Sequence, residues 1–274
     1  MNYRHAFHAG NFADVVKHLA LVSALTHLKK KDKPFVAIDT HGGRGVYDLT
    51  SREARRTAEH ESGISRLAKL KGAEGVLGEY LALVRGDHYP GSPLIAAKLL
   101  RPQDRLIAVE KHPEEFSELR DALHQFERAR VIEGDGYEKL IAALPPPERR
   151  GLVLIDPPYE DDKEFQRAAQ VLGQATRRFA TGVYMLWFPI KSKAAADAFC
   201  GEIANTGIDK LLRIDIETKA PPKPGKPDDK TRLTNAGLLI VNPPFGLDTD
   251  MREAARVIAP ALTARIDVEW LAGA

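Results

Sequence analysis

Four consecutive residues, Asp156-Pro157-Pro158-Tyr159, have side chains and spacing that could do chemistry. They follow the apolar run 151–155, which predicts a buried strand. Prolines have a fixed φ and no N–H, so their backbone carbonyls are held outward as acceptors. These carbonyls and the Asp156 carboxylate could bind the protons of an exocyclic amine, and the Tyr159 ring offers a face for a flipped base. Acceptors of this kind suit methylation of an adenine amino group, because they stabilise the positive charge that grows on nitrogen.

A second tetrapeptide of the same type, Asn242-Pro243-Pro244-Phe245, follows the apolar run 237–241. Both tetrapeptides resemble motif IV of S-adenosylmethionine-dependent amino methyltransferases, so the tetrapeptide alone does not choose between them. The order of the strands does. Asp156 follows the fourth predicted strand, whereas Asn242 follows the last, where we expect the edge of the sheet. We therefore interpret Asn242 as part of a strand-ending turn and Asp156 as the catalytic residue.

Earlier strand ends predict the cofactor site. Glu110 is the last residue of its strand, where a carboxylate can bind both hydroxyls of a ribose, and Asp135 can accept a hydrogen bond from an adenine amino group. Ligands of open α/β sheets bind outside the carboxyl ends of the strands. A nicotinamide enzyme could also use an acid after the glycine-rich turn, but hydride transfer has no use for Asp-Pro-Pro-Tyr. Three strand ends form this set: Asp39 with Gly43 and Gly45, Glu110, and Asp135 with Gly136.

The elements that position these residues alternate between strand and helix, which predicts a Rossmann-like α/β fold with a mainly parallel sheet. The strands are expected at 35–39, 105–110, 130–133, 151–155, 182–188, 209–217 and 235–241. The main helices are expected at 11–31, 113–125, 163–179 and 192–206. We expect Asn11 to cap the first of them and Ser92 to cap a short helix.

The first crossover is longer than a Rossmann unit needs, because the second strand begins far beyond the glycine-rich turn. Residues 50–90 have helical composition and are interpreted as an inserted helical subdomain. The whole chain, 1–274, is expected to be a single methyltransferase domain around this insertion. A basic, proline-rich loop at 219–227 separates the last two predicted strands.

Composition narrows the class of protein. The 274 residues include 43% hydrophobic and 28% charged residues, as in an ordinary enzyme, and a net charge of +2 excludes an overall basic signature. Any nucleic-acid surface must therefore come from local patches: the block of Tyr3, Arg4 and Lys17, the loop 219–230, or the insertion. A single cysteine, Cys200, excludes an intramolecular disulfide and a thiolate metal cluster. The absence of a signal peptide or a membrane-length apolar run predicts a cytoplasmic location, and a monomer is expected.

The N-terminal 18 residues contain three histidines, which could form a zinc site, but no cysteine accompanies them and no metal is expected. This block is similar to a known family, the ribosomal RNA large-subunit methyltransferase J family. The resemblance spans nearly the whole chain and rests on these stretches: Tyr3–His18, Asp39-Thr40-His41, Tyr89-Pro90-Gly91-Ser92-Pro93 and Asp156-Pro157-Pro158-Tyr159.

The resemblance implies S-adenosylmethionine-dependent methylation of N6 of one adenine in 23S ribosomal RNA, on a class I methyltransferase fold with a helical insertion. It implies that Asp156 is catalytic and that cofactor is bound by His18, His41, Ser92, Glu110, Asp135, Gly136 and Asp156. It implies an rRNA contact for Tyr3, with Lys17 in the same block, and the chemistry above adds Pro157 and Tyr159. The family more often has Ala-Gly-x-Gly where this chain has Gly42-Gly43-Arg44-Gly45, and Arg44 is assigned no role.

Without the family resemblance, the residues do not identify the substrate that is methylated. Asp-Pro-Pro-Tyr occurs in enzymes that methylate adenine in DNA, adenine in RNA and glutamine side chains. A DNA adenine-N6 methyltransferase and a non-catalytic RNA-binding protein on the same fold are therefore the alternatives. The intact Asp156 and Tyr159 argue against the non-catalytic alternative.

Overall fold

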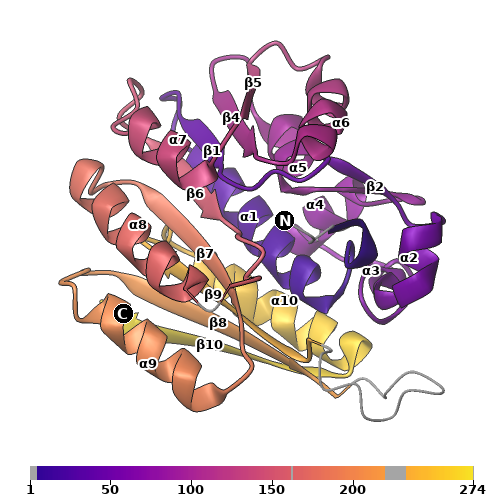
Figure 1. The fold of residues 1–274 in the computed structure, drawn as a ribbon. Coiled ribbons are helices and arrows are strands. Elements are labelled where there is room, and N and C mark those ends of the chain that lie inside the picture. The colour runs from indigo at the N-terminus through magenta and orange to yellow at the C-terminus, as the bar shows by residue number, and fades with distance from the viewer. Residues whose placement is uncertain (1–4, 162, 220–232, 274) are drawn as a thin grey trace.

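The protein is described by a computed structural model that covers residues 5–161, 163–219 and 233–273 (Figure 1). Its centre is an eight-stranded sheet with the order β10-β8-β9-β7-β6-β1-β4-β5. The strands are β1 (Val36–Asp39), β4 (Arg105–Glu110), β5 (Ala129–Glu133), β6 (Gly151–Ile155), β7 (Val183–Pro189), β8 (Leu211–Thr218), β9 (Asn235–Val241) and β10 (Ala264–Ala272). The predicted α/β class and mainly parallel sheet are confirmed, since β5, β4, β1, β6 and β7 all pair in parallel.

Helices cover both faces of the sheet, and each face has its own apolar core. On one face lie α1 (Phe12–Lys29), α4 (Gly75–Leu83), α5 (Ser92–Leu99), α6 (Pro113–Leu123) and α10 (Leu247–Leu262). On the other face lie α7 (Gly136–Ala143), α8 (Glu164–Arg178) and α9 (Lys193–Ala204). Strands β6, β7 and β9 are nearly continuous apolar runs because both of their faces are covered.

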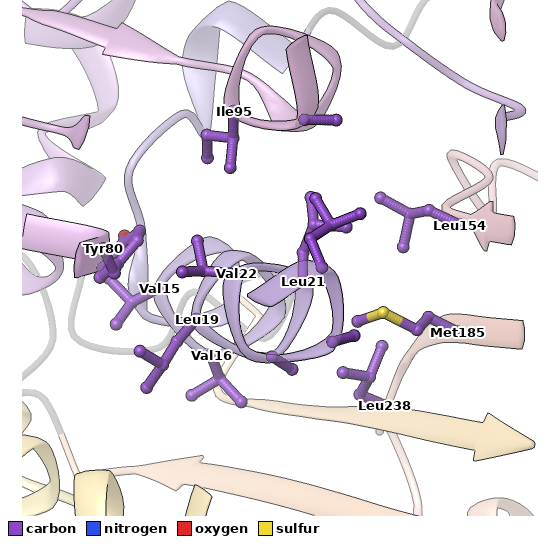
Figure 2. Packing of buried hydrophobic residues seen from close by; sticks show 14 of the residues in the cluster. Val15, Val16, Leu19, Leu21, Val22, Tyr80, Ile95, Leu154, Met185 and Leu238 are labelled. Carbon is purple, nitrogen blue, oxygen red and sulfur yellow. The ribbon is translucent and has the colours of Figure 1, made fainter. Parts of the chain in front are cut away.

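Helix α1 is the most deeply buried helix of the fold, and it carries site residues between the sheet and α4, α5 and α10. Figure 2 shows its Val15, Leu19 and Val22 packed with residues from several elements. The predicted cap at its start is confirmed, because the Asn11 side chain accepts hydrogen bonds from the N–H groups of Ala13 and Asp14. This cap and this packing fix the first turns of α1, where the side chains of the site lie.

The last third of the sheet differs from the sequence prediction. Strand β9 is not an edge strand: it lies antiparallel between β7 and β8. A further helix, α10, and a further strand, β10, follow it, and β10 forms the edge beside β8. The prediction ended the sheet at 241 because β10 alternates exposed and half-buried positions, with only Val268 buried, and so lacks the apolar run of a central strand.

Residues between β1 and β4 form a short antiparallel pair and several helices. Strand β2 (Val46–Asp48) pairs with β3 (His88–Pro90), and between them lie α2 (Arg52–Thr57), η2 (Glu59–Ser62), α3 (Ile64–Leu67) and α4. The expected cap of α5 was wrong by one residue. Gly91 holds the cap position and Ser92 is the first helical residue, because its hydroxyl binds Asp39 instead.

Candidate active site

A cavity of about 540 Å³ lies at the carboxyl ends of the parallel strands. Of the predicted set at the first strand end, Gly43 borders this cavity, whereas Asp39 and Gly45 do not. The other described residues predicted to bind cofactor or substrate all border it: Lys17, His18, His41, Ser92, Glu110, Asp135, Gly136, Asp156, Pro157 and Tyr159. Tyr3 and Arg4 lie outside the described residues. Residues far apart in the sequence therefore meet in one cavity, as the strand order predicts.

Asp156 directly follows β6 and forms an ion pair with a buried lysine. Its Oδ2 lies 2.5 Å from Nζ of Lys17, which in turn lies 2.8 Å from Oδ1 of Asp14. Burial alone would lower the pKa of Lys17, but the two carboxylates raise it above its ordinary value. Among the described residues, Oδ1 of Asp156 accepts no hydrogen bond. One oxygen of the carboxylate is thus held by Lys17, and the other is available to a ligand.

The lysine is itself held by a chain of contacts at the start of α1. Asp14 lies one helical turn before Lys17, and its Oδ2 lies 2.9 Å from Nε2 of His5. Burial would raise the pKa of Asp14, but His5 and Lys17 together hold it well below its usual range. Lys17 is only 3% exposed, and its ammonium is bound by the carboxylates of Asp14 and Asp156 at the border of the cavity. Sequence reasoning missed Asp14 and His5, although the i, i+3 spacing of Asp14 and Lys17 is a signal for such a pair.

Tyr159 borders the cavity but its ring is largely covered. The residue has a left-handed backbone, φ 48°, and its hydroxyl donates a hydrogen bond to the carbonyl of Trp187 at 2.8 Å. The ring packs against Phe165, with 4.6 Å between centroids, and 8% of the residue is exposed. Tyr159 is therefore a rigid wall of the cavity, and only part of its surface is open to a base.

Glu110 holds the glycine-rich turn. Its two carboxylate oxygens accept hydrogen bonds from the N–H of Gly43 at 2.8 Å and of His112 at 2.7 Å. Arg44, which had no assigned role, forms a two-point ion pair with Glu115 on α6, with contacts of 2.9 and 2.5 Å. The turn is thus fastened on both sides, and Gly43 with φ +59° takes a backbone conformation that favours glycine.

Asp135 caps helix α7, because its Oδ1 accepts from the N–H groups of Tyr137 and Glu138. Arg167 and Lys111 also contact its carboxylate, at 2.9 and 3.3 Å. Burial would raise the pKa of Asp135, but Arg167 and these donors lower it. Asp135 therefore both caps α7 and borders the cavity.

Two histidines with shifted pKa values border the cavity, and a buried carboxyl with a shifted pKa, Asp39, lies beside Ser92 of its lining. Burial lowers the pKa of His18 to about 3 and that of His41 to about 4, so both rings are neutral near pH 7. His18 lies with Nδ1 2.8 Å from the hydroxyl of Tyr89. Burial raises the pKa of Asp39 to about 6, although a hydrogen bond from Ser92 opposes this shift.

The second tetrapeptide, 242–245, lies away from the cavity, at the end of the sheet where the parallel strands begin. Asn242 follows β9, which runs antiparallel to β7, and its side-chain amide donates to the carbonyls of Ala180 and Gly182 before β7 begins. Its φ of 51° marks the end of the strand. The interpretation of Asn242 as a strand-ending turn agrees with this placement, and Asn242 does not border the cavity.

In the described part of the chain, no helix is long and apolar enough to cross a membrane, and no group of three potential metal-binding side chains lies together. The sheet order, the glycine-rich turn held by Glu110 and the Asp-Pro-Pro-Tyr carboxylate at the end of β6 are those of a class I methyltransferase.

Comparisons with known proteins narrow this class. A family model described as "Ribosomal RNA large subunit methyltransferase D, RlmJ" matches residues 32–272, and the chain belongs to this family. Two relatives, each called "Ribosomal RNA large subunit methyltransferase J", are 39% identical (Escherichia coli) and 37% identical (Haemophilus influenzae). In both cases the alignment covers 99% of each chain. The crystal structure of protein LPL1258 from Legionella pneumophila is 33% identical and has a TM-score of 0.86 over 96% of this chain and 98% of that one.

Proposed function

We propose that this enzyme transfers the methyl group of S-adenosylmethionine to N6 of an adenine in 23S ribosomal RNA. Membership of the family supports an rRNA methyltransferase. The observation that carries the proposed chemistry is the Asp156 carboxylate, which lies at the end of β6 in the cavity and has one oxygen bound to Lys17. The DNA adenine-N6 alternative uses the same chemistry, and family membership favours RNA.

The residues of the cavity suit the adenosine half of the cofactor. Glu110 and Asp135 supply carboxylates for ribose hydroxyls and for an adenine amino group. Gly136 borders the cavity and allows α7 to approach the end of β1 closely, because a Cβ there would lie 1.9 Å from the carbonyl oxygen of Thr40. The neutral rings of His18 and His41 and the hydroxyl of Ser92 complete the wall that the family resemblance assigns to cofactor.

The bound cofactor supplies an electrophilic methyl group. Asp156 accepts a hydrogen bond from the adenine N6 through Oδ1, and the carbonyl of Pro157 accepts the second N6–H. Both acceptors draw the nitrogen lone pair out of the ring and stabilise the positive charge that grows as the nitrogen–carbon bond forms and the carbon–sulfur bond of the cofactor breaks. The methylated nitrogen then releases one proton through its hydrogen bond to Asp156. Lys17 keeps the carboxylate in place through Oδ2, 2.5 Å away. Tyr159, fixed by Trp187 and Phe165, forms a wall beside the target base.

The remaining assignments are proposals of the same kind. Residues 50–90 form an inserted subdomain of a single catalytic domain, 1–274, and the protein acts as a monomer in the cytoplasm on rRNA. Tyr3, which lies outside the described residues, contacts the target nucleotide.

A deletion strain tests the function directly. Its 23S rRNA, digested to nucleosides and mapped by mass spectrometry, should lack one N6-methyladenine that a plasmid copy of the gene restores. A copy with Asp156→Ala should not restore it. Loss of N6-methyladenine from genomic DNA, with 23S rRNA unchanged, would instead support the DNA alternative.

A further inference from the structure

A second surface of the molecule has a strong positive charge, and it lies opposite the cavity. Five loops, counted together with the adjoining ends of helices and strands, lead into the parallel strands β1, β4, β5, β6 and β7 at the amino edge of the sheet. They contain twelve lysines and arginines and four acidic residues, a net charge of +8 in a chain of +2. These amino-edge loops are 29–35, 100–105, 124–130, 144–150 and 177–182.

Some of these cations hold the loops, and others face solvent. Arg101 and Arg150 donate to backbone carbonyls of the first loop, which fixes its path. The exposed cations are Lys30, Lys31, Lys33, Arg128, Arg130, Arg149, Arg177 and Arg178. Because neighbouring strands are about 4.8 Å apart, the five loops spread these charges over about 19 Å. This is a surface, and not a single ion-binding point.

A fully exposed aromatic side chain borders the same edge. Phe245 is 100% exposed, and Val257 at 45% is the other large hydrophobic residue exposed in the described part of the chain. The backbone on either side is held: Asn242 donates to Ala180 and Gly182, and a Cβ built on Gly246 would lie 2.9 Å from the ring of His27. Two prolines, at 243 and 244, restrict the turn further.

These contacts place Phe245 among the charged loops. Ala180 and Gly182 belong to the loop that also carries Arg177, and His27 lies one turn before Lys30, whose Nζ is 2.8 Å from Nδ1 of that ring. An exposed aromatic ring at an edge that also carries exposed cations is a combination that binds single-stranded nucleic acid, with stacking on bases and charge on phosphates. A hydrophobic protein partner would not require a net charge of +8 around the ring.

We propose that this amino-edge patch, the exposed cations of the five loops together with Phe245, is a second RNA-binding surface. It binds a segment of the ribosomal RNA other than the one that enters the cavity, because the five residues of β6 separate the two edges by about 17 Å. An unpaired base stacks on Phe245, and the cations contact the phosphates beside it. The inference rests on the proposed function and extends it to a substrate larger than the target nucleotide.

Binding of full-length 23S rRNA and of a short unstructured oligonucleotide, each measured over a range of salt concentrations, tests this surface. The variants are Lys31→Gln with Lys33→Gln, Arg149→Gln with Arg177→Gln, and Phe245→Ala. The matched control replaces the exposed Arg252 and Arg256 of α10 with glutamine. None of these side chains makes a hydrogen bond or an ion pair in the described part of the chain, so the fold should persist, and thermal unfolding checks this.

Each double charge variant should weaken binding of the full-length rRNA and reduce its log–log salt slope by about 1.4, or about 0.7 for each lost phosphate contact. Phe245→Ala should weaken binding roughly 5- to 150-fold with an unchanged slope, because it removes stacking and no charge. The control should match the unmodified enzyme. The short oligonucleotide, which is single-stranded and can occupy the same patch, should also bind more weakly to each variant.

Unchanged affinity and salt slope for full-length rRNA in the charge variants and Phe245→Ala would overturn the inference. So would a change of oligomeric state in Phe245→Ala with rRNA affinity intact, which would assign the surface to a protein contact. Methyl transfer by the unmodified enzyme separates the two claims. If 23S rRNA is methylated while the variants bind it normally, only this surface is rejected, whereas no methylation by the unmodified enzyme rejects the proposed function.

Discussion

The ammonium of Lys17 lies 2.5 Å from the carboxylate of Asp156, although 139 residues separate them along the chain. Lys17 projects from the second turn of α1, and Asp156 follows β6, so the pair joins the N-terminal helix to the end of a central strand. Asp14 binds the same ammonium from the opposite side. The position of the proposed catalytic carboxylate therefore depends on how α1 packs against the sheet.

The first prediction concerns this pair. Lys17→Met should lower turnover on rRNA strongly, because Asp156 loses the partner that positions it. Since the two residues act as a unit, Lys17→Met combined with Asp156→Asn should be little worse than Asp156→Asn alone. Turnover of the two single variants and the double variant completes the cycle.

Folding must be followed in the same proteins. Removing one partner of a buried ion pair typically costs about 3–5 kcal/mol of the free energy of unfolding. Urea unfolding should therefore show a lower midpoint for Lys17→Met. Independent, multiplicative effects of the two substitutions on turnover would show that Lys17 does not act through Asp156.

The shifted pKa of Asp39 predicts that the free energy of unfolding depends on pH. Its pKa is raised by burial to about 6 in the folded protein, against an ordinary value of 3.8. A raised pKa means that the folded state binds the proton more tightly, so this contribution to stability is complete below about pH 4 and is lost as the pH rises through 6. The loss is of the order of 3 kcal/mol.

Asp39→Asn removes the titrating group and keeps an oxygen acceptor. The free energy of unfolding of the unmodified protein, relative to that of Asp39→Asn, should therefore fall between pH 4 and pH 7. Urea unfolding of both proteins at several pH values measures this difference. A constant difference across this range would show that the Asp39 carboxyl titrates normally.

The close contact at Gly136 predicts that a larger residue there disturbs the proposed cofactor site. A Cβ there would lie 1.9 Å from the carbonyl oxygen of Thr40, so Gly136→Ala must displace either α7 or the end of β1. We expect a lower melting temperature and weaker binding of S-adenosylmethionine. Gly201→Ala is the control, since a Cβ on that helical glycine meets nothing within 4 Å and should stabilise α9 by about 0.5–1 kcal/mol. Equal behaviour of the two variants would contradict the tight approach of α7 to Thr40.

Glu110 is expected to contribute to the affinity of the enzyme for S-adenosylmethionine. Its carboxylate holds the glycine-rich turn through Gly43 and borders the cavity, so Glu110→Ala removes both this support and an acceptor for ribose hydroxyls. Loss of a charged hydrogen-bond partner typically costs about 1.5–3 kcal/mol, so calorimetry should show roughly 10- to 150-fold weaker binding of S-adenosylmethionine. The control is Glu118→Ala, because Glu118 is an exposed carboxylate on α6, the helix beside the glycine-rich turn. Unchanged affinity in Glu110→Ala would reject the assignment.

Sequence patterns predicted the part of the fold that apolar runs specify. The strands that end at Asp39, Glu110 and Asp156 are buried on both faces, so their composition is unambiguous. Strand β10 was missed because it alternates exposed and half-buried residues at the sheet edge. Antiparallel insertion of β9 was also missed, because strand direction depends on the length and path of the connecting segments and not on composition.

Some features of the candidate site could likewise be predicted from the sequence, and others could not. Carboxylates at strand ends could be predicted, because parallel strands bring their carboxyl ends to one edge of the sheet. The environment of Lys17 could not, since its burial depends on how α1 packs against α4, α5 and α10. The role of Arg44 likewise required the position of Glu115 on α6.

The central claim is tested most directly by methyl transfer in vitro to unmethylated 23S rRNA with isotopically labelled S-adenosylmethionine. At saturating rRNA, the account predicts one labelled N6-methyladenine per rRNA molecule with the unmodified enzyme and with Asn242→Ala, and a rate about 10²–10³ lower with Asp156→Ala. Full activity of Asp156→Ala, a loss of activity in Asn242→Ala, or label on an atom other than adenine N6 would contradict it.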